Sequence, residues 1–281
     1  MWKLAVPSVA AQFINLLYNI VDRIYIGHIP VIGGTALTGL GVTFPIITLI
    51  SAFAAFAGQG GAPLASIRLG AGDREGAERI LGNSVTLLLC ASAVLTVVFQ
   101  LIQRPVLMAF GASEATIGYA TDYITIYLLG TVFVQLALGL NTFISAQGRA
   151  MTAMCSVLIG AILNIVLDPV FIFVFDMGVR GAALATILSQ AVSAAWVVLF
   201  LCSRRSGLRI WPQYMRLRRP GCGPLHHAVH REPGHRGAEL RPAAVRGRPV
   251  RGHPHHHPER HADGHHAHPG DHPGGTAPHE L

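Results

Sequence analysis

Two aspartates lie inside long apolar stretches of this chain, and they are the residues most able to do chemistry. Asp22 lies in LLYNIVDRIYIGHI, and Asp168 lies in AILNIVLDPVFIFVF. An ionisable side chain at bilayer depth is costly, and it commonly marks an ion or proton pathway. Asn, Tyr or Thr residues lie near both acids, so the pattern predicts that they share a proton or bind a cation. The alternative is that each acid caps or ends a helix at the lipid interface.

The spacing around the two acids adds to this prediction. Asn164 is four residues before Asp168 and Tyr18 is four before Asp22, so each pair shares one helix face, one turn apart. A carboxylate in a low-dielectric interior resists ionisation, which suits proton uptake near neutral pH or Na⁺ binding with neutral oxygens as co-ligands. Pro169 removes a backbone hydrogen bond beside the second acid and lowers the cost of a helix bend. The alternative is that Pro169 is an ordinary helix irregularity with no role in function.

The composition indicates a polytopic membrane protein. The chain has 281 residues, a positive mean hydropathy and a net charge of +7. Residues 1–203 carry eight Lys or Arg and eight Asp or Glu, whereas residues 204–281 carry thirteen Arg and six acids. The positive charge therefore belongs to the C-terminal tail and does not indicate nucleic-acid binding. The four cysteines form no CxxC pair, so neither a disulfide framework nor a zinc site is indicated.

The predicted fold is all-α, a membrane bundle of six transmembrane helices followed by a disordered tail. About 20 apolar residues are needed to cross a bilayer. The predicted spans are residues 5–27, a segment within 37–67, 82–103, 119–145, 151–175 and 181–202. Between the second and third, RLGAGDREGAERILGNS is predicted to form a short amphipathic cytoplasmic helix with an acid at its N-cap. The predicted domains are a six-helix lobe over 1–210 and a tail over 211–281.

The tail has an unusual composition. Residues 220–281 contain no Lys, Ile, Phe, Tyr, Trp, Met, Asn, Gln or Ser, and fourteen of the fifteen histidines lie beyond residue 204. Such a segment cannot bury a core and is predicted to be disordered. Its Pro, Ala, Arg, Gly and His content is typical of a GC-rich gene read out of frame. The alternative is a metal-binding tract, HPHHHPERHADGHHAH.

Residues 1–210 resemble the bacterial branch of the multidrug and toxic compound extrusion (MATE) family. The resemblance rests on an ordered set of segments: PSVAAQFINLLYNIVDRIYIGHI, LGAGDREGAERILGNS, NTFISAQGRAMTAM, ILNIVLDPVFIF and GVRGAALATILSQ. It implies a fold of two six-helix lobes around a central cavity, of which this chain supplies the first. It also implies a secondary active antiporter that exports organic, often cationic compounds in exchange for H⁺ or Na⁺. No nucleophile–base pair or phosphate-binding loop indicates an enzyme.

The resemblance also implies roles for individual residues. The site that couples transport to the cation would consist of Asp22, Asn164, Asp168 and Thr186. The substrate cavity would include Pro7, Tyr18, Tyr123 and Asn141. No metal or other cofactor is implied beyond the coupling ion, and the partners would be the lipid bilayer and small organic substrates.

Other functions stay open at this point. A lipid-linked oligosaccharide flippase is disfavoured, because such cavities carry arginines and Arg23 is the one arginine well inside a predicted span. A non-transporting membrane fragment of a disrupted gene is compatible with transporter ancestry, and a His-tailed metal sensor is a third alternative. This chain alone is expected not to transport, because one wall of the cavity would be missing. A homodimer would be the exception.

The loop charges predict the orientation of the spans. With the N-terminus inside, cytoplasmic segments hold eight Lys or Arg and external segments hold Arg104 and Arg180, as the positive-inside rule requires. We therefore expect a multi-pass protein of the cell (inner) membrane with both termini in the cytoplasm. Single cysteines placed near Gly33 and Asp176, after removal of the native thiols, should react with a membrane-impermeant reagent from outside. Reaction from inside only would contradict this topology.

Overall fold

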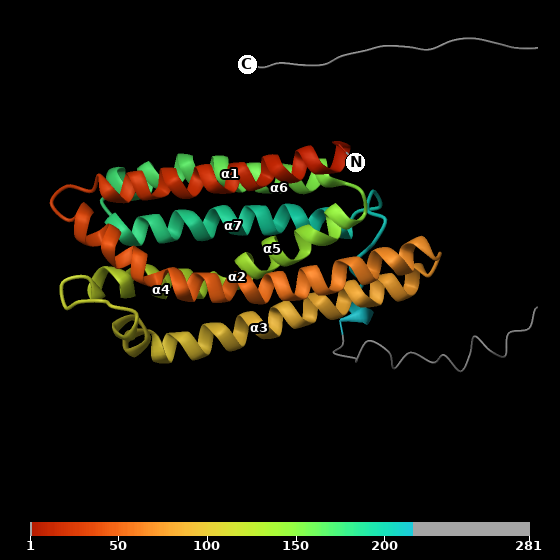
Figure 1. The fold of residues 1–281 in the computed structure, drawn as a ribbon, viewed down its shortest axis with the longest axis horizontal. Helices are drawn as coiled ribbons and strands as arrows, with labels where there is room; N and C mark the ends of the chain where they lie inside the picture. Colours follow the sequence, from red (N-terminus) through yellow and green to blue (C-terminus); the bar gives the residue numbers. More distant parts are fainter. Residues whose placement is uncertain (1, 216–281) are drawn as a thin grey trace, which may run out of the picture. The chain divides into compact units, whose positions relative to one another are not determined.

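The computed structural model describes residues 2–215, with side chains from Val6 onward. Within this part of the chain the regular structure is helical and contains no strand, which confirms the all-α prediction (Figure 1). Residues 216–281 lie outside the described residues, and so do the predictions of a disordered, frame-shifted or metal-binding tail. The predicted domain boundary at residue 210 stays a prediction.

Seven α-helices follow one another along the described chain, with a π-helical turn before the last of them. The elements are α1 (Trp2–Gly27), α2 (Gly33–Gly70), α3 (Arg74–Ala109), α4 (Ile117–Leu129), α5 (Thr131–Ala146), α6 (Ala150–Pro169), the π-helical η1 (Val170–Val174), α7 (Gly178–Cys202) and the short 3-10 helix η2 (Pro212–Tyr214).

Most of these helices can cross a membrane. Among the described residues, α2, α3, α6 with η1, and α7 are each long and apolar enough, and α4 with α5 makes a fifth span if the bent pair counts as one. These helices correspond to five of the six predicted spans. The remaining one, α1, forms as predicted but carries Gln12, Asn15, Asn19, Asp22 and Arg23. Its crossing of the membrane stays a prediction.

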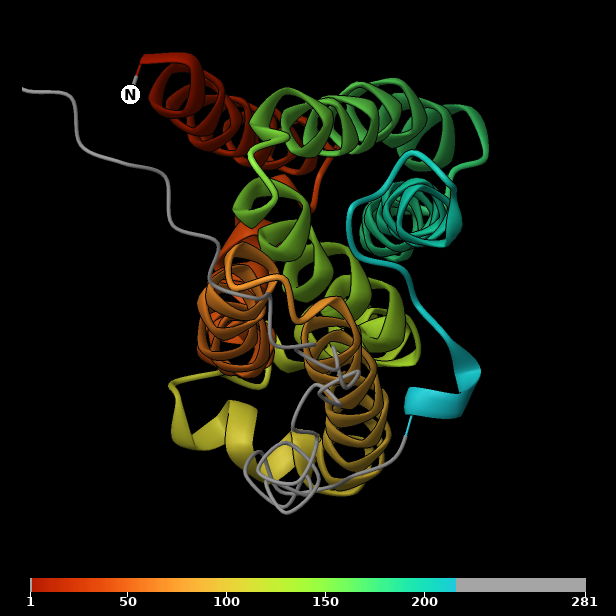
Figure 2. The same cartoon turned by 90° about the vertical axis from the view of Figure 1, so that its right-hand side faces the viewer.

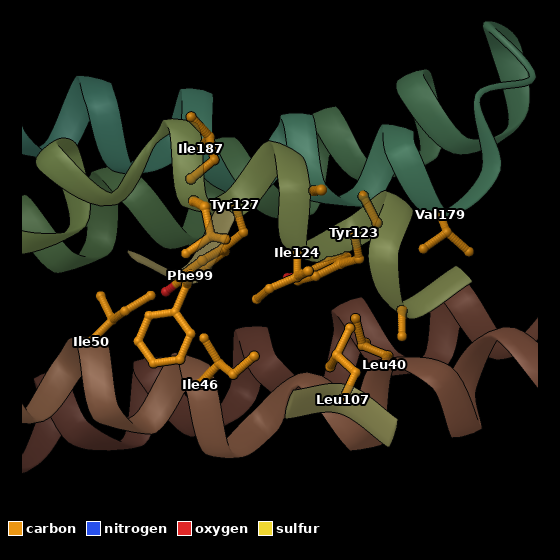
Figure 3. Close-up of a cluster of buried hydrophobic side chains, with 14 of the residues drawn as sticks. Leu40, Ile46, Ile50, Phe99, Leu107, Tyr123, Ile124, Tyr127, Val179 and Ile187 are labelled. Atoms are coloured by element: carbon orange, nitrogen blue, oxygen red, sulfur yellow. The ribbon is translucent and has the colours of Figure 1, made fainter. Parts of the chain in front are cut away.

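The helices pack side by side along one direction. α1 lies against α6, α2 lies against α3, and α5 runs between them and contacts α2 and α7 (Figures 1 and 2). The turns at 28–32, 110–116 and 175–177 lie at one end of the bundle, here called the α4 end. The turns at 71–73 and 147–149 lie at the other end, here called the α2–α3 end. One apolar cluster fills each half, and Figure 3 shows the cluster of Leu40, Ile46, Ile124 and their neighbours.

The predicted span 119–145 is broken into α4 and α5, which meet at 60°. Gly130 lies at the break, and a Cβ there would overlap the Ile187 side chain of α7. The last carbonyls of α4 find partners on α3: Thr96 Oγ1 donates to Leu128 O at 2.8 Å and Gln100 Nε2 donates to Thr125 O at 2.9 Å. Such partners let a helix break persist in a membrane interior.

The short amphipathic helix predicted between the second and third spans does not form a separate element, so this prediction is wrong. Its charged residues begin α3 directly, so the helix continues from Arg74 into the apolar span. The predicted N-cap acid is confirmed: Asp73 Oδ1 accepts a hydrogen bond from Gly76 N at 2.8 Å. This backbone bond, followed by the nearby Arg68 guanidinium, lowers the pKa of the Asp73 carboxyl.

Residues 203–215 pack against the α2–α3 end of the bundle and are here called the strap. Gln147 Oε1 accepts hydrogen bonds from Ser206 Oγ at 3.0 Å, Gly207 N at 2.8 Å and Leu208 N at 3.1 Å. Glu78 Oε1 accepts one from Arg209 N at 3.3 Å. The strap therefore ties the start of α3 to the turn between α5 and α6.

Two glycines of α2 make a matched test of this packing. A Cβ at Gly58 would lie 2.6 Å from Gly139 O of α5, whereas a Cβ at Gly60 would meet nothing within 4 Å. We expect Gly58→Ala to lower the free energy of unfolding by about 1–3 kcal/mol through overpacking. Gly60→Ala should raise it by up to about 1 kcal/mol, because alanine favours helix more than glycine does. Thermal unfolding of the purified protein in detergent measures both, and equal effects of the two substitutions would contradict this packing.

Candidate cation and substrate site

The predicted coupling residues come together where α1, α6 and α7 meet, toward the α4 end of the bundle. Asn164 Nδ2 donates to Asp168 Oδ1 at 3.1 Å and approaches Thr186 Oγ1 at 3.5 Å. Asp168 is fully buried, Asn164 is 2% exposed and Asp22 is 8% exposed. Four residues from a stretch of 165 positions thus occupy one place in the fold.

Two carboxyl groups face each other in this site. The side chains of Asp22 on α1 and Asp168 on α6 interact directly. Asp22 Oδ1, Asp168 Oδ2 and Asn164 Oδ1 are buried, and none of the three has a hydrogen-bond partner among the described residues. Two adjacent carboxylates cannot both stay charged in a low-dielectric interior without a shared proton or a cation. The unpaired oxygens are the ligand type that either ion would use.

Tyrosines of α4 line the same centre. Tyr123 is 4% exposed and interacts with the Thr186 side chain and with the charge of Asp22. Its ring stacks on that of Tyr127, with ring centroids 6.1 Å apart and planes at 18°. Figure 3 shows both rings pointing into the apolar cluster between α4 and α2. Tyr123 therefore lies between the carboxyl pair and this apolar cluster.

A polar pocket adjoins the site on its other side. The volume of this pocket is ≈ 30 Å³, which is room for about two water molecules. The lining residues come from α1, α5, α6 and α7, and they include Asn15, Tyr18, Asn141, Ser156, Gly160, Asn164, Thr186, Ser189, Gln190 and Ser193. Ser156 Oγ donates to Asn141 Oδ1 at 3.1 Å, and Ser193 Oγ donates to Ser156 O at 2.9 Å. The pocket can therefore offer hydroxyl and amide oxygens to a polar or cationic group.

Not every residue assigned by resemblance lies in this pocket. Tyr18 and Asn141 line it, and Tyr123 lies beside the carboxyl pair. Pro7 is buried in the second turn of α1 and is not among the lining residues. It lies fifteen residues before Asp22, about 22 Å along the helix. Its assignment to the substrate cavity stays a prediction.

Sequence reasoning missed several lining residues, although a signal for them exists. One face of α6 carries a small or polar residue at every fourth position, namely Ser156, Gly160, Asn164 and Asp168. Asn15 is three residues before Tyr18 and shares its face of α1. The serines of α7 have no comparable mark, because single serines are common in membrane helices.

Arg23 is directed away from its neighbouring acid, as its place on the helix predicts. Its guanidinium carbon lies 5.8 Å from the ring centroid of Phe44 on α2. This cation–π contact places the charge on the side of α1 that faces α2. Arg23 therefore makes no direct contact with the Asp22 carboxyl, although its charge still acts on that group.

The fold and the site define a multi-pass helical membrane protein with a buried carboxyl pair. The MatE family model matches residues 7–170. The chain is 27% identical over 208 residues to the multidrug export protein MepA of Staphylococcus haemolyticus, covering 74% of this chain and 46% of that protein. It is 25% identical over 200 residues to MepA of Staphylococcus aureus, covering 71% and 44%. The chain thus belongs to the MatE family.

Solved structures agree with this assignment. A crystal structure of MATE in the bent conformation superimposes with a TM-score of 0.70 at 29% identity, over 75% of this chain and 47% of that one. An outward-facing multidrug resistance MATE transporter of the MOP superfamily gives a TM-score of 0.71 at 29% identity, over 77% and 48%. The chain therefore spans about half the length of the relatives that it matches.

The unpaired oxygens of the site predict an unusual effect on stability. In Asp168→Asn, the retained oxygen still accepts from Asn164, and the new amide can donate to Asp22. We expect this variant to unfold at a higher temperature than the native chain, because a buried unpaired acceptor facing a second carboxyl is removed. Asn164→Leu should unfold at a lower temperature, since it leaves Asp168 without its donor. Thermal unfolding at pH 8 without added Na⁺ measures both, and a large destabilisation by Asp168→Asn would contradict this account.

Proposed function

We propose that this chain forms the first lobe of a multidrug exporter that exchanges organic, often cationic compounds for H⁺ or Na⁺. A carboxyl pair inside a membrane bundle, beside a polar pocket, suits the uptake and release of an ion. The single observation that carries the proposal is the direct interaction of Asp22 and Asp168 in the interior, with unpaired oxygens around them. The names of the MepA relatives support export of drugs as the activity.

The arrangement suggests how ion binding is linked to the pocket. Asp22 belongs to α1, whereas Asp168 and Thr186 belong to α6 and α7, so the ion joins one helix to two others. Without the ion, two facing carboxylates repel and push α1 away from α6. With H⁺ or Na⁺ bound, they attract. Because α1 also supplies Asn15 and Tyr18 to the pocket wall, ion binding changes the shape of the pocket.

In this proposal the bound ion and the substrate have opposite effects on the position of α1. Asn141 and Tyr18 would contact the substrate, and Asp22, Asn164, Asp168 and Thr186 would hold the coupling ion. A bound ion draws α1 inward and narrows the pocket, which favours substrate release. The chain would lie in the inner membrane with both termini in the cytoplasm, in contact with lipid and with small organic substrates, and with no nucleic acid. A second lobe of the same family would complete the cavity.

We expect energy-dependent dye export when the chain is expressed with the second half of a MepA relative in an efflux-deficient host. Asp168→Asn should abolish this export while insertion is retained, because an amide cannot take up and release a proton or balance Na⁺. Asp22→Asn should weaken it. Glu114→Gln is the control, since that exposed carboxyl lies outside the site. Imposed proton and sodium gradients then identify the coupling ion.

Two results would decide against the proposal. Export that is unchanged in Asp168→Asn would remove the carboxyl pair from the coupling. Failure of the inserted chain to export any dye, alone or with the second half, would favour a non-transporting membrane fragment. Retention of a lipid-linked oligosaccharide instead of a dye would favour a flippase.

A further inference from the structure

The carboxyl pair lies close to the α4 end of the bundle. Asp22 is five residues from the end of α1, about 7.5 Å along the helix, and Asp168 is the penultimate residue of α6. Toward the opposite end, the pocket continues past Asn164 to Ser156 and Ser193, and a buried apolar cluster lies beyond them. The α4 end is therefore the nearer of the two ends of the bundle to the carboxyl pair.

An ion pair lies at the surface of the α4 end. Arg180 Nη2 of α7 donates to Asp122 Oδ1 of α4 at 2.8 Å. The two side chains are 62% and 38% exposed, so the contact lies at the surface. It joins two helices that are 58 residues apart in sequence. We call Asp122 and Arg180 the clasp.

The clasp is anchored to the site on the α7 side. Arg180 lies between Val179, which is buried, and Gly181, where a Cβ would come within 2.6 Å of Phe171 O. Met177 N also donates to Phe171 O at 3.1 Å. Phe171 belongs to η1, the π-helical turn that follows Asp168 and Pro169 directly. The backbone at Arg180 is thus fixed relative to the segment that carries the buried carboxyl.

The clasp is anchored to the site on the α4 side as well. Asp122 immediately precedes Tyr123, whose side chain interacts with Thr186 and with the charge of Asp22. Thr186 lies six residues after Arg180 on α7. The helices α4 and α7 therefore meet at the surface through the clasp, beside the carboxyl pair through Tyr123 and Thr186, and along the buried apolar cluster between them.

We propose that the clasp of Asp122 and Arg180 is a positioning pair that holds Tyr123 beside Asp22 and Thr186 and limits the coupling ion's access from the α4 end. This proposal rests on the proposed function, because it concerns the ion path of that same site. When the clasp is closed, α4 is held against α7 beside the carboxyl pair. When it opens, this end of α4 moves away from α7 and exposes the carboxyl pair to solvent.

A second ion pair at the same end serves as a matched control. Arg104 Nη2 lies 3.9 Å from Glu114 Oε2, and the side chains are 69% and 81% exposed. This pair joins α3 to the loop before α4 and does not bridge α4 to α7. If the clasp acts by holding α4 on α7, loss of the control pair should not change the access of solvent to the buried carboxyls.

The test is the rate at which a water-soluble carbodiimide modifies Asp22 and Asp168 in the full chain reconstituted in lipid nanodiscs, read by mass spectrometry. Asp122→Asn and Arg180→Gln should each raise this rate several-fold. The exchange of charges, Asp122→Arg with Arg180→Asp, should return it toward the native rate. Arg104→Gln should leave it unchanged. The unfolding temperature of each variant is measured in parallel, and we expect it to stay within a few degrees of the native value, because exposed ion pairs contribute little to stability.

Several outcomes would overturn the clasp. Native labelling rates in both single variants would do so, and so would a charge exchange that folds but labels as fast as the single variants. Equal acceleration in Arg104→Gln would show general loosening of this end. Labelling is read without transport, so a failure of dye export bears on the proposed function and not on the clasp.

Discussion

The facing of two carboxyl groups across α1 and α6 is the constraint on which the rest of this lobe depends. A charge buried away from water needs a partner, and here each acid has another acid beside it. Asn164 satisfies one oxygen of Asp168, and the remaining acceptors stay unpaired among the described residues. The described residues therefore leave acceptor oxygens in the site that a proton or a cation would satisfy.

The helix irregularities of the described chain lie close to this carboxyl pair. η1 follows Pro169 directly and carries the chain to the start of α7, so Asp168 and Thr186 can face the same centre. The break at Gly130 turns α4 so that Tyr123 reaches that centre while α5 packs on α2. Side chains of α3 donate hydrogen bonds to carbonyl groups near the end of α4, which compensates for backbone hydrogen bonds lost at the break. Each departure from a straight helix therefore places a side chain of the site.

Much of this arrangement could be predicted from the sequence, because apolar length and buried acids are local signals. The pairing of Asn164 with Asp168 followed from their spacing of four, and the family resemblance brought Asp22 and Thr186 to them. The break at Gly130 could not be predicted, since glycine also occurs in every other predicted span and the Ile187 side chain that crowds Gly130 comes from a distant helix. The strap could not be predicted either, because Gln147 is an ordinary turn residue until its three donors are brought to it by the fold.

The two ends of the lobe are held in different ways, and this difference bears on how the lobe can move. At the α2–α3 end, Gln147 and Glu78 bind backbone N–H groups of the strap, and a buried apolar cluster lies behind them. At the α4 end, the exposed pair of Asp122 and Arg180 bridges α4 and α7, and a buried apolar cluster that includes Tyr123 and Val179 packs behind it. Both ends are therefore closed by buried packing, and they differ in the polar contacts that cover it. A change at the carboxyl pair should reach the α4 end first, because the pair lies nearer to that end.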